Sequence, residues 1–418
     1  MNERQSNHPL LPKATEKIFT VVMLFYTTGA VMPFILGEVD PLSPAQIKPM
    51  ELAVKAALYA VTFYFIALRW RSFVRGVWNV KWITALVLIA VASTSWSQDP
   101  YLTLRGSAVL LATTAFGFYF GTRYTVPEQL RLLGWACFLV VSMSFFSAIL
   151  FPGYGTEQGS YAGAWRGVFI QKNGLAEAMV LAVLVFLFAR AGMGRSLRWL
   201  GIAASLTLLY LSRSVTGMII CAGIMAILAL YRLVGPRSAK AIPFTAAGLL
   251  IVGFMVVQNF TVAGALQLVG RSPDLTGRTD LWSAALLSIS KRPLLGYGFS
   301  AFWQGMNGES GSVLDKIGWM AGYAHNGFLD LMLHLGLLGL VTFAVGYLVL
   351  WRRALGLHSR EPGPVPIWLC MFLIVMLLYN FTEGSILTQN SIYWVLYTST
   401  AVALFPASFR RFCAGPNR

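Results

Sequence analysis

The chain has 418 residues, of which 57% are hydrophobic and only 11% are charged, and its mean hydropathy is +0.65. A soluble domain carries about 25% charged residues, so this composition excludes an ordinary soluble protein. The net charge of +16 would suit a nucleic-acid-binding protein, but no basic segment with interleaved aromatic residues is present, and no nucleic acid partner is expected. Basic residues instead gather in the cytoplasmic loops of membrane proteins.

Apolar segments follow one another along the whole chain, so we predict an all-α polytopic membrane protein with one integral membrane domain over residues 1–418. About 12 transmembrane helices are expected, and the pair 198–212 and 215–231 could instead form one long or broken helix. The expected segments are 18–37, 51–68, 82–96, 103–121, 132–151, 174–190, 198–212, 215–231, 243–260, 326–350, 366–381 and 391–406.

The distribution of basic residues predicts the orientation of these segments. With both termini in the cytoplasm, roughly two thirds of the 32 lysines and arginines lie on the cytoplasmic side. The external side then carries 152–173, the turn 382–390 and the long periplasmic loop 261–325. Long loops are commonly functional, and residues 280–292 of this loop are expected to form an amphipathic helix.

His325 lies where the long loop enters a membrane helix. A histidine can accept a proton near neutral pH, so His325 is a candidate general base for a hydroxyl group. The alternative is a histidine that caps the helix or lies at the membrane interface. His334 follows nine residues later, about half a turn away around a helix and about 13.5 Å along it, so the two histidines cannot share a metal ion and no metal is expected.

Four external cations run against the usual charge bias: Arg278, Arg213, Arg166 and Lys172. Arginine offers a planar fork for phosphate oxygens, and lysine a point charge. An anionic ligand would explain the group. The alternative is structural ion pairing, with the acidic residues Asp274, Asp280 or Glu177 as partners.

Two further expectations concern the membrane boundary. Glu177 lies about one turn inside an expected span, where an unpaired carboxylate is costly, and Lys172 is its expected partner. The tryptophans Trp165, Trp282, Trp303 and Trp319 are expected to lie in the interfacial belt, with a sugar-stacking role open for one or two.

Several motifs in a fixed order resemble those of one family. GRTDLW (277–282) and PLLGYGF (293–299) precede AHNGFLDLMLHLGLLGL (324–340), in which His325-Asn326 is followed by Gly336-x-x-Gly339. This pattern resembles the O-antigen ligase and Wzy polymerase superfamily. The segments WSQDPYLTLRG (96–106), WRGVFIQKNG (165–174), LSRSVTG (211–217) and NFTEGSILTQNSIYW (380–394) look like its ExoQ-like exopolysaccharide polymerase branch.

The resemblance implies a GT-C-like fold in the bacterial inner membrane and a metal-independent, inverting glycosyl transfer at its periplasmic face, with no cofactor. The donor would be an undecaprenyl-pyrophosphate-linked oligosaccharide. His325 matches the family's base, and Arg278 matches an arginine that binds the pyrophosphate. For a second such arginine, Arg213 fits by its distance of 65 residues and Arg166 by its loop context, with Lys172 a further candidate. Asn326 and Glu177 are assigned supporting roles.

The acceptor remains open between two members of the superfamily. A polymerase uses a second lipid-linked repeat unit, whereas an O-antigen ligase uses the lipid A-core. The Lys-Asn pair at 172–173 and the ExoQ-like segments favour the polymerase, for which a chain-length regulator is a candidate partner. A lipid-linked glycan transporter or flippase is an alternative of another class, although no internal repeat of fixed period is visible. A scaffold protein would leave the external cations unexplained.

Overall fold

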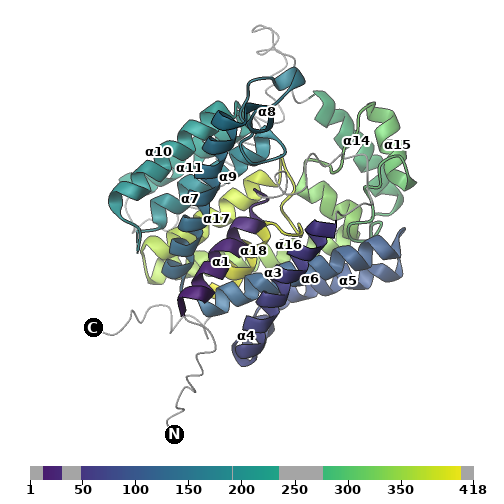
Figure 1. Cartoon of the computed structure of the whole chain (residues 1–418). Helices are drawn as coiled ribbons and strands as arrows, with labels where there is room; N and C mark the ends of the chain where they lie inside the picture. Colours follow the sequence, from purple (N-terminus) through teal and green to yellow (C-terminus); the bar gives the residue numbers. More distant parts are fainter. Residues whose placement is uncertain (1–12, 31–48, 191, 235–275, 406–418) are drawn as a thin grey trace.

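The structure is a computed structural model that describes residues 13–30, 49–190, 192–234 and 276–405. The described chain is a bundle of α-helices, with a smaller helical unit at one end (Figure 1). The expected segment 243–260 and the beginning of the long loop, 261–275, lie outside the described residues.

Every other expected segment coincides with a helix, although several boundaries differ. The first one begins five residues earlier and ends at Thr27, and the pair around residue 213 forms two separate helices. The helices of the expected spans are α1 (Lys13–Thr27), α3 (Pro49–Leu68), α5 (Lys81–Ala92), α6 (Pro100–Arg123), α7 (Val126–Leu150), α9 (Lys172–Phe188), α10 (Arg195–Leu211), α11 (Val215–Val234), α16 (Gly327–Arg360), α17 (Pro364–Tyr379) and α18 (Ile392–Ala403).

The protein is a polytopic membrane protein. Among the described residues, four helices are long and apolar enough to cross a membrane by themselves. A fifth span results if α4 (Trp70–Asn79) and the helix that follows it, which are bent by 91° at their junction, are counted together. The remaining apolar helices among the described residues are too short, or not apolar enough, to cross a membrane by themselves.

The core of the bundle is continuous and rich in aromatic side chains. Helix α18 packs along α6, and α10 packs along α9, while α17 contacts α9, α11 and α16. Trp394 and Tyr119 are fully buried or nearly so between these helices. Because lipid is as apolar as leucine, close packing rather than water exclusion holds such helices together.

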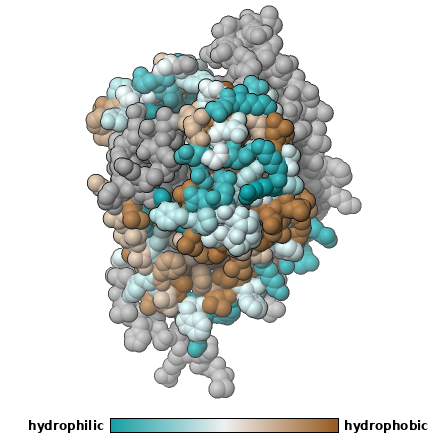
Figure 2. Space-filling view, turned by 90° about the vertical axis from the view of Figure 1, so that its right-hand side faces the viewer, coloured by the Kyte–Doolittle hydropathy of each residue, from teal (hydrophilic) through white to brown (hydrophobic). Residues whose placement is uncertain are grey.

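The long loop forms the smaller unit. It contains α14 (Thr276–Lys291) and α15 (Gly308–Ile317), so the helix expected over 280–292 is present and begins four residues earlier. Leu281, Phe302 and Leu314 form a separate hydrophobic core beneath these two helices. The unit lies at the end of the molecule opposite α4 (Figure 1). Hydrophilic residues gather in the upper part of the face that Figure 2 shows, and hydrophobic residues gather below them.

The loop is joined to the bundle at a break in α16. Gly336 has φ +61° and ψ −158°, which interrupts the helix. A Cβ atom at this position would lie 2.4 Å from the backbone of Leu294, so only glycine permits the approach of the loop segment 293–298.

That loop segment takes over the backbone hydrogen bonds that the break releases. The amides of Leu337 and Leu338 donate to the carbonyls of Pro293 and Leu294, at 2.8 and 3.1 Å. In return, the carbonyls of residues 333 and 334 accept from the amides of residues 297 and 298. Unpaired backbone groups are costly inside a membrane protein. Gly296 of PLLGYGF and Gly336 of GLLGL allow this interlock, because a Cβ atom at either position would meet the backbone of the other segment.

Candidate active site

The turn between α17 and α18 is organised by one buried asparagine. Asn380 donates from Nδ2 to the carbonyl of Met376 and to Ser385, and its Oδ1 accepts from the amides of Ser385 and Ile386. The amide of Gly327, the first residue of α16, donates to the carbonyls of Asn380 and Glu383. The turn therefore lies directly against the beginning of α16.

This contact brings His325 to the turn. Asn326 is the N-cap of α16, because its side chain accepts from the amides of Phe328 and Leu329 at 3.0 and 3.2 Å. His325 precedes the cap with φ +48°, a conformation that few non-glycine residues adopt. Asn326 therefore caps the helix, and the imidazole of His325 is not used for capping.

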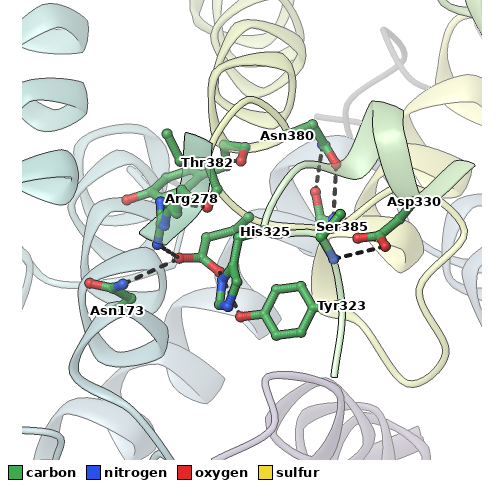
Figure 3. Close-up of polar contacts among 12 residues, drawn as sticks. Asn173, Arg278, Tyr323, His325, Asp330, Asn380, Thr382 and Ser385 are labelled. Atoms are coloured by element: carbon green, nitrogen blue, oxygen red, sulfur yellow. Dashed lines mark hydrogen bonds and ion pairs between the residues drawn. The ribbon is translucent and has the colours of Figure 1, made fainter. Parts of the chain in front are cut away.

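Glu383 lies at the centre of the site, and its carboxylate has four side-chain partners. Oε1 accepts from Asn173 and from Arg278, each at 3.3 Å. Oε2 accepts from Tyr323 at 2.8 Å and lies 3.4 Å from Nδ1 of His325. Figure 3 shows Asn173 and Arg278 converging on this point with Tyr323 and His325, which belong to one segment. We call Glu383 with these four residues the carboxylate cluster.

Within the cluster, the carboxylate of Glu383 is ionised at neutral pH, whereas the phenol of Tyr323 is not. Burial would raise the pKa of Glu383, but the hydrogen bond with His325 and the positive charge of Arg278 outweigh this effect and hold the pKa below its usual value of 4.5. Burial and the neighbouring carboxylate raise the pKa of Tyr323 well above 10, so its phenol keeps its proton and donates it to Glu383.

The ionised carboxylate determines the state of the histidine ring. A carboxylate can only accept hydrogen bonds, so Nδ1 of His325 is the nitrogen that carries hydrogen. In the neutral imidazole, Nε2 then has the free lone pair. No described residue forms a hydrogen bond with Nε2, and the ring is stacked against Tyr323 at a centroid distance of 4.0 Å. The arrangement can therefore present a base to a hydroxyl group.

Arg278 comes from the first turn of α14 and reaches the same turn. It donates from Nη1 to the carbonyl of Thr382 at 3.1 Å and from Nη2 to Glu383. Its ion-pair partner is therefore Glu383 and neither of the neighbours Asp280 and Glu177; Asp274 lies outside the described residues. A guanidinium has five N–H donors, so these two contacts leave donors for a phosphate oxygen.

Arg213 lies beside the cluster, in the turn between α10 and α11. It has φ +52°, its side chain is exposed, and its Nη1 lies 3.5 Å from the carbonyl of Ala162. The next residue, Ser214, donates to Oδ1 of Asn173 at 3.0 Å, and Asn173 in turn donates to Glu383. A chain of two hydrogen bonds thus ties this turn to Glu383.

Arg166 and Lys172 have contacts within the external loop. Arg166 donates to the carbonyls of Tyr154 and Ile170, at 2.8 and 3.2 Å. The ammonium group of Lys172 lies 3.6 Å from the ring centre of Tyr161. These contacts connect segments of the loop with one another.

The expected pair between Lys172 and Glu177 is not formed, and that expectation was wrong. The lysine faces Tyr161, where a cation gains from the electron-rich ring face. The carboxylate of Glu177 lies on α9 and lines a cavity beside the cluster. In the described part of the chain it has no hydrogen-bond or ion-pair partner.

Sequence reasoning missed the central residue. Glu383 lies in the external turn 382–390, which the sequence singled out as a segment without identifying this side chain. An acidic residue between two apolar helices was the available signal. Two tryptophans expected in the interfacial belt also have internal roles: Trp282 donates to the carbonyl of Ala324, and Trp303 donates to Asp330.

Comparison with known proteins identifies relatives of the chain. Residues 200–344 match the family described as O-antigen ligase, Wzy_C. The match contains Arg213, Arg278 and His325. The chain is also 27% identical, over 310 residues, to the exopolysaccharide production protein ExoQ of Rhizobium meliloti. That similarity covers 69% of this chain and 68% of ExoQ. Both comparisons confirm the resemblance inferred from the motifs.

Proposed function

The chain is related to the O-antigen ligase family, and on that premise we propose that it is a polysaccharide polymerase. The reaction joins undecaprenyl-pyrophosphate-linked oligosaccharide repeat units into a surface polysaccharide. The observation that carries the proposal is the carboxylate cluster, in which one ionised glutamate contacts both the candidate base and the candidate phosphate-binding arginine.

His325 acts as the general base in this proposal. Nε2 accepts the proton of the acceptor hydroxyl as its oxygen attacks the anomeric carbon of the donor. Glu383 holds the ring through Nδ1 and stabilises the imidazolium that forms, as the carboxylate does in a catalytic triad. The acceptor oxygen bonds to the anomeric carbon while the bond from that carbon to the pyrophosphate breaks, with inversion.

Arg278 stabilises the departing pyrophosphate. Positive charge that is already in place where negative charge develops lowers the barrier without reorganisation. The leaving group therefore needs no general acid. Arg213 is the preferred second arginine, because its side chain is exposed, the next residue is hydrogen-bonded to Asn173 of the cluster, and it lies within the matched family region. Arg166 and Lys172 lie before that region and contact their own loop.

The site belongs, in this proposal, to the periplasmic face of a bundle with about 12 transmembrane helices and cytoplasmic termini. The helix α8 (Pro152–Gly155) and the loop helices α14 and α15 lie at one end of the molecule, opposite α4 (Figure 1). This arrangement agrees with the bias of lysines and arginines towards the other set of loops.

A ligase is the second candidate, because the matched family is described by that activity. It would transfer the same lipid-linked glycan to the lipid A-core. The similarity to ExoQ extends over 310 residues and favours the polymerase. Both activities need a base and a phosphate-binding arginine, so the acceptor decides between them.

The test is a transfer assay with purified protein and a lipid-pyrophosphate-linked repeat unit as both donor and acceptor. We expect a ladder of multiples of the unit from the wild type and none from His325→Ala. Arg292→Ala is the matched control for handling of the membrane protein, because Arg292 is exposed, its guanidinium lies over the ring of Tyr297, and it is not part of the carboxylate cluster.

Single transfer to added lipid A-core, with no ladder, would replace the polymerase by the ligase. If neither product formed and the lipid-linked unit crossed liposome membranes instead, a transporter would be the better description and the proposal would fail.

A further inference from the structure

A cavity of about 640 Å³ adjoins the carboxylate cluster. Its wall includes Tyr323 and Glu383, which also belong to the cluster, and it extends between α9, the first turns of α16 and the turn 383–389. Pockets that bind small organic ligands have volumes of roughly 300–1,000 Å³. The cavity is therefore large enough for sugar rings and lies directly beside the candidate base.

The wall of the cavity offers no positive charge to a phosphate. Its described lining includes neither lysine nor arginine, and the phosphate-binding candidate Arg278 is not part of it. The acidic residues of the wall are Glu177, Asp330 and Glu383, and the ionised carboxylate of Glu383 would repel a phosphate in this partly buried site. The ligand should therefore be uncharged and rich in hydrogen-bond donors.

Glu177 is the strongest indication of a missing donor. Its carboxylate lines the cavity, and within the described residues no side chain or backbone amide forms a hydrogen bond with it. A partly buried carboxylate without partners loses hydration that nothing in the protein replaces. Sugar hydroxyls are donors of the kind that a carboxylate accepts.

Aromatic side chains provide the apolar part of the wall. Trp303 lines the cavity, and its Nε1 donates to Oδ1 of Asp330 at 2.9 Å. The same oxygen accepts from the amide of Ala324 at 3.0 Å. The hydrogen bond from Trp303 to Asp330 fixes the indole, so that the flat apolar ring of Trp303 faces the same space as the carboxyl groups. Apolar walls with a few placed polar groups are typical of ligand sites.

We propose that this cavity is a binding subsite for a neutral sugar ring of the glycan, with Glu177 accepting from its hydroxyls. The inference rests on the proposed function, and it adds the place at which the uncharged part of the substrate binds. Pyrophosphate and sugar then occupy adjoining sites, with Glu383 and Tyr323 in the shared wall.

The test measures binding of two probes to purified full-length protein. One probe is undecaprenyl pyrophosphate, which lacks sugar. The other is the free oligosaccharide released by mild acid from the lipid-linked repeat unit, which lacks phosphate. We expect Glu177→Gln to weaken binding of the oligosaccharide about tenfold, because one of the two oxygen acceptors of the side chain is lost, and to leave binding of undecaprenyl pyrophosphate unchanged.

Two further variants complete the test. Gln171→Leu removes an exposed polar side chain from the cavity wall with little risk to folding, and we expect about a threefold loss of oligosaccharide binding. Asp315→Asn is the control, because it removes an exposed carboxylate from α15, away from the cavity lining, and should change neither probe.

The outcomes separate this inference from the proposed function. If the wild type polymerises the unit but Glu177→Gln and Gln171→Leu bind the oligosaccharide normally, the subsite is wrong and the polymerase stands. Weakened oligosaccharide binding in a protein that makes no product would instead support the subsite and reject the polymerase.

A last measurement decides whether the sugar in the cavity belongs to the donor or to the acceptor. Hydrolysis of the donor can be followed with water as the only acceptor. If Glu177→Gln slows hydrolysis and transfer equally, the cavity holds the donor sugar. If it slows transfer alone, the cavity holds the acceptor sugar.

Discussion

The bundle and the loop unit have separate hydrophobic cores, and the site lies between them. The bundle core contains side chains such as Leu184 and Trp394, whereas the loop core is built around Leu281 and Phe302. Arg278 is supplied by the loop unit, and Glu383 by the bundle. The comparison teaches that neither unit holds a complete site: docking of the loop assembles it.

The largest expected effect on transfer follows from Glu383→Gln. This substitution keeps the shape of the side chain that the bundle supplies to the site and removes its charge. The amide can donate to Nδ1 of His325 and favour the wrong ring tautomer, so transfer should fall on the order of 10²–10⁴-fold. Initial rates at saturating donor measure the loss. A rate within twofold of the wild type would show that the carboxylate does not orient the base.

Arg278→Ala removes the arginine that the loop unit supplies to the same site. Loss of one group that stabilises developing charge lowers turnover about 10²–10³-fold, and weaker binding of undecaprenyl pyrophosphate should accompany it. Arg166→Ala is a matched control, because Arg166 bonds to carbonyls of its own loop and should retain most activity. Equal losses in both variants would contradict the assignment of Arg278.

Leu281→Ala and Leu184→Ala compare the two cores directly. Each leucine is fully buried, and such truncations cost about 2–5 kcal/mol. Hydrogen exchange of Leu281→Ala should increase within residues 276–325 while the bundle stays protected, and transfer should fall. Leu184→Ala should loosen α9 and its neighbours instead. If both variants loosened the whole protein alike, the two cores would form one cooperative unit.

Gly336→Ala acts at the interlock, and we expect it to cost less stability than the two leucine truncations. The new Cβ would meet the backbone of Leu294, and the positive φ is unfavourable for alanine. We expect a loss of about 1–3 kcal/mol, from overpacking, measured by thermal unfolding. Gly356→Ala is the control in the same helix: it meets no atom within 4 Å and should be neutral or stabilising.

Sequence patterns were sufficient to predict the helices, because hydropathy over about 20 residues is a local property. They also identified His325 and Arg278 as candidates, through motifs whose residues lie close together in the chain. They failed at Lys172, for which a nearby carboxylate was the expected partner. Its ammonium group instead lies over the ring of Tyr161, within the external loop.

The sequence by itself determined a helical membrane protein with a histidine at a loop–helix junction and cations on its external side. The tertiary structure alone decided that Glu383 joins His325 to Arg278, across separations of 58 and 105 residues. It also decided that Glu177 faces a cavity without a partner. The physical reason is that such contacts depend on how distant helices pack, and that information is absent from the local pattern of any single segment.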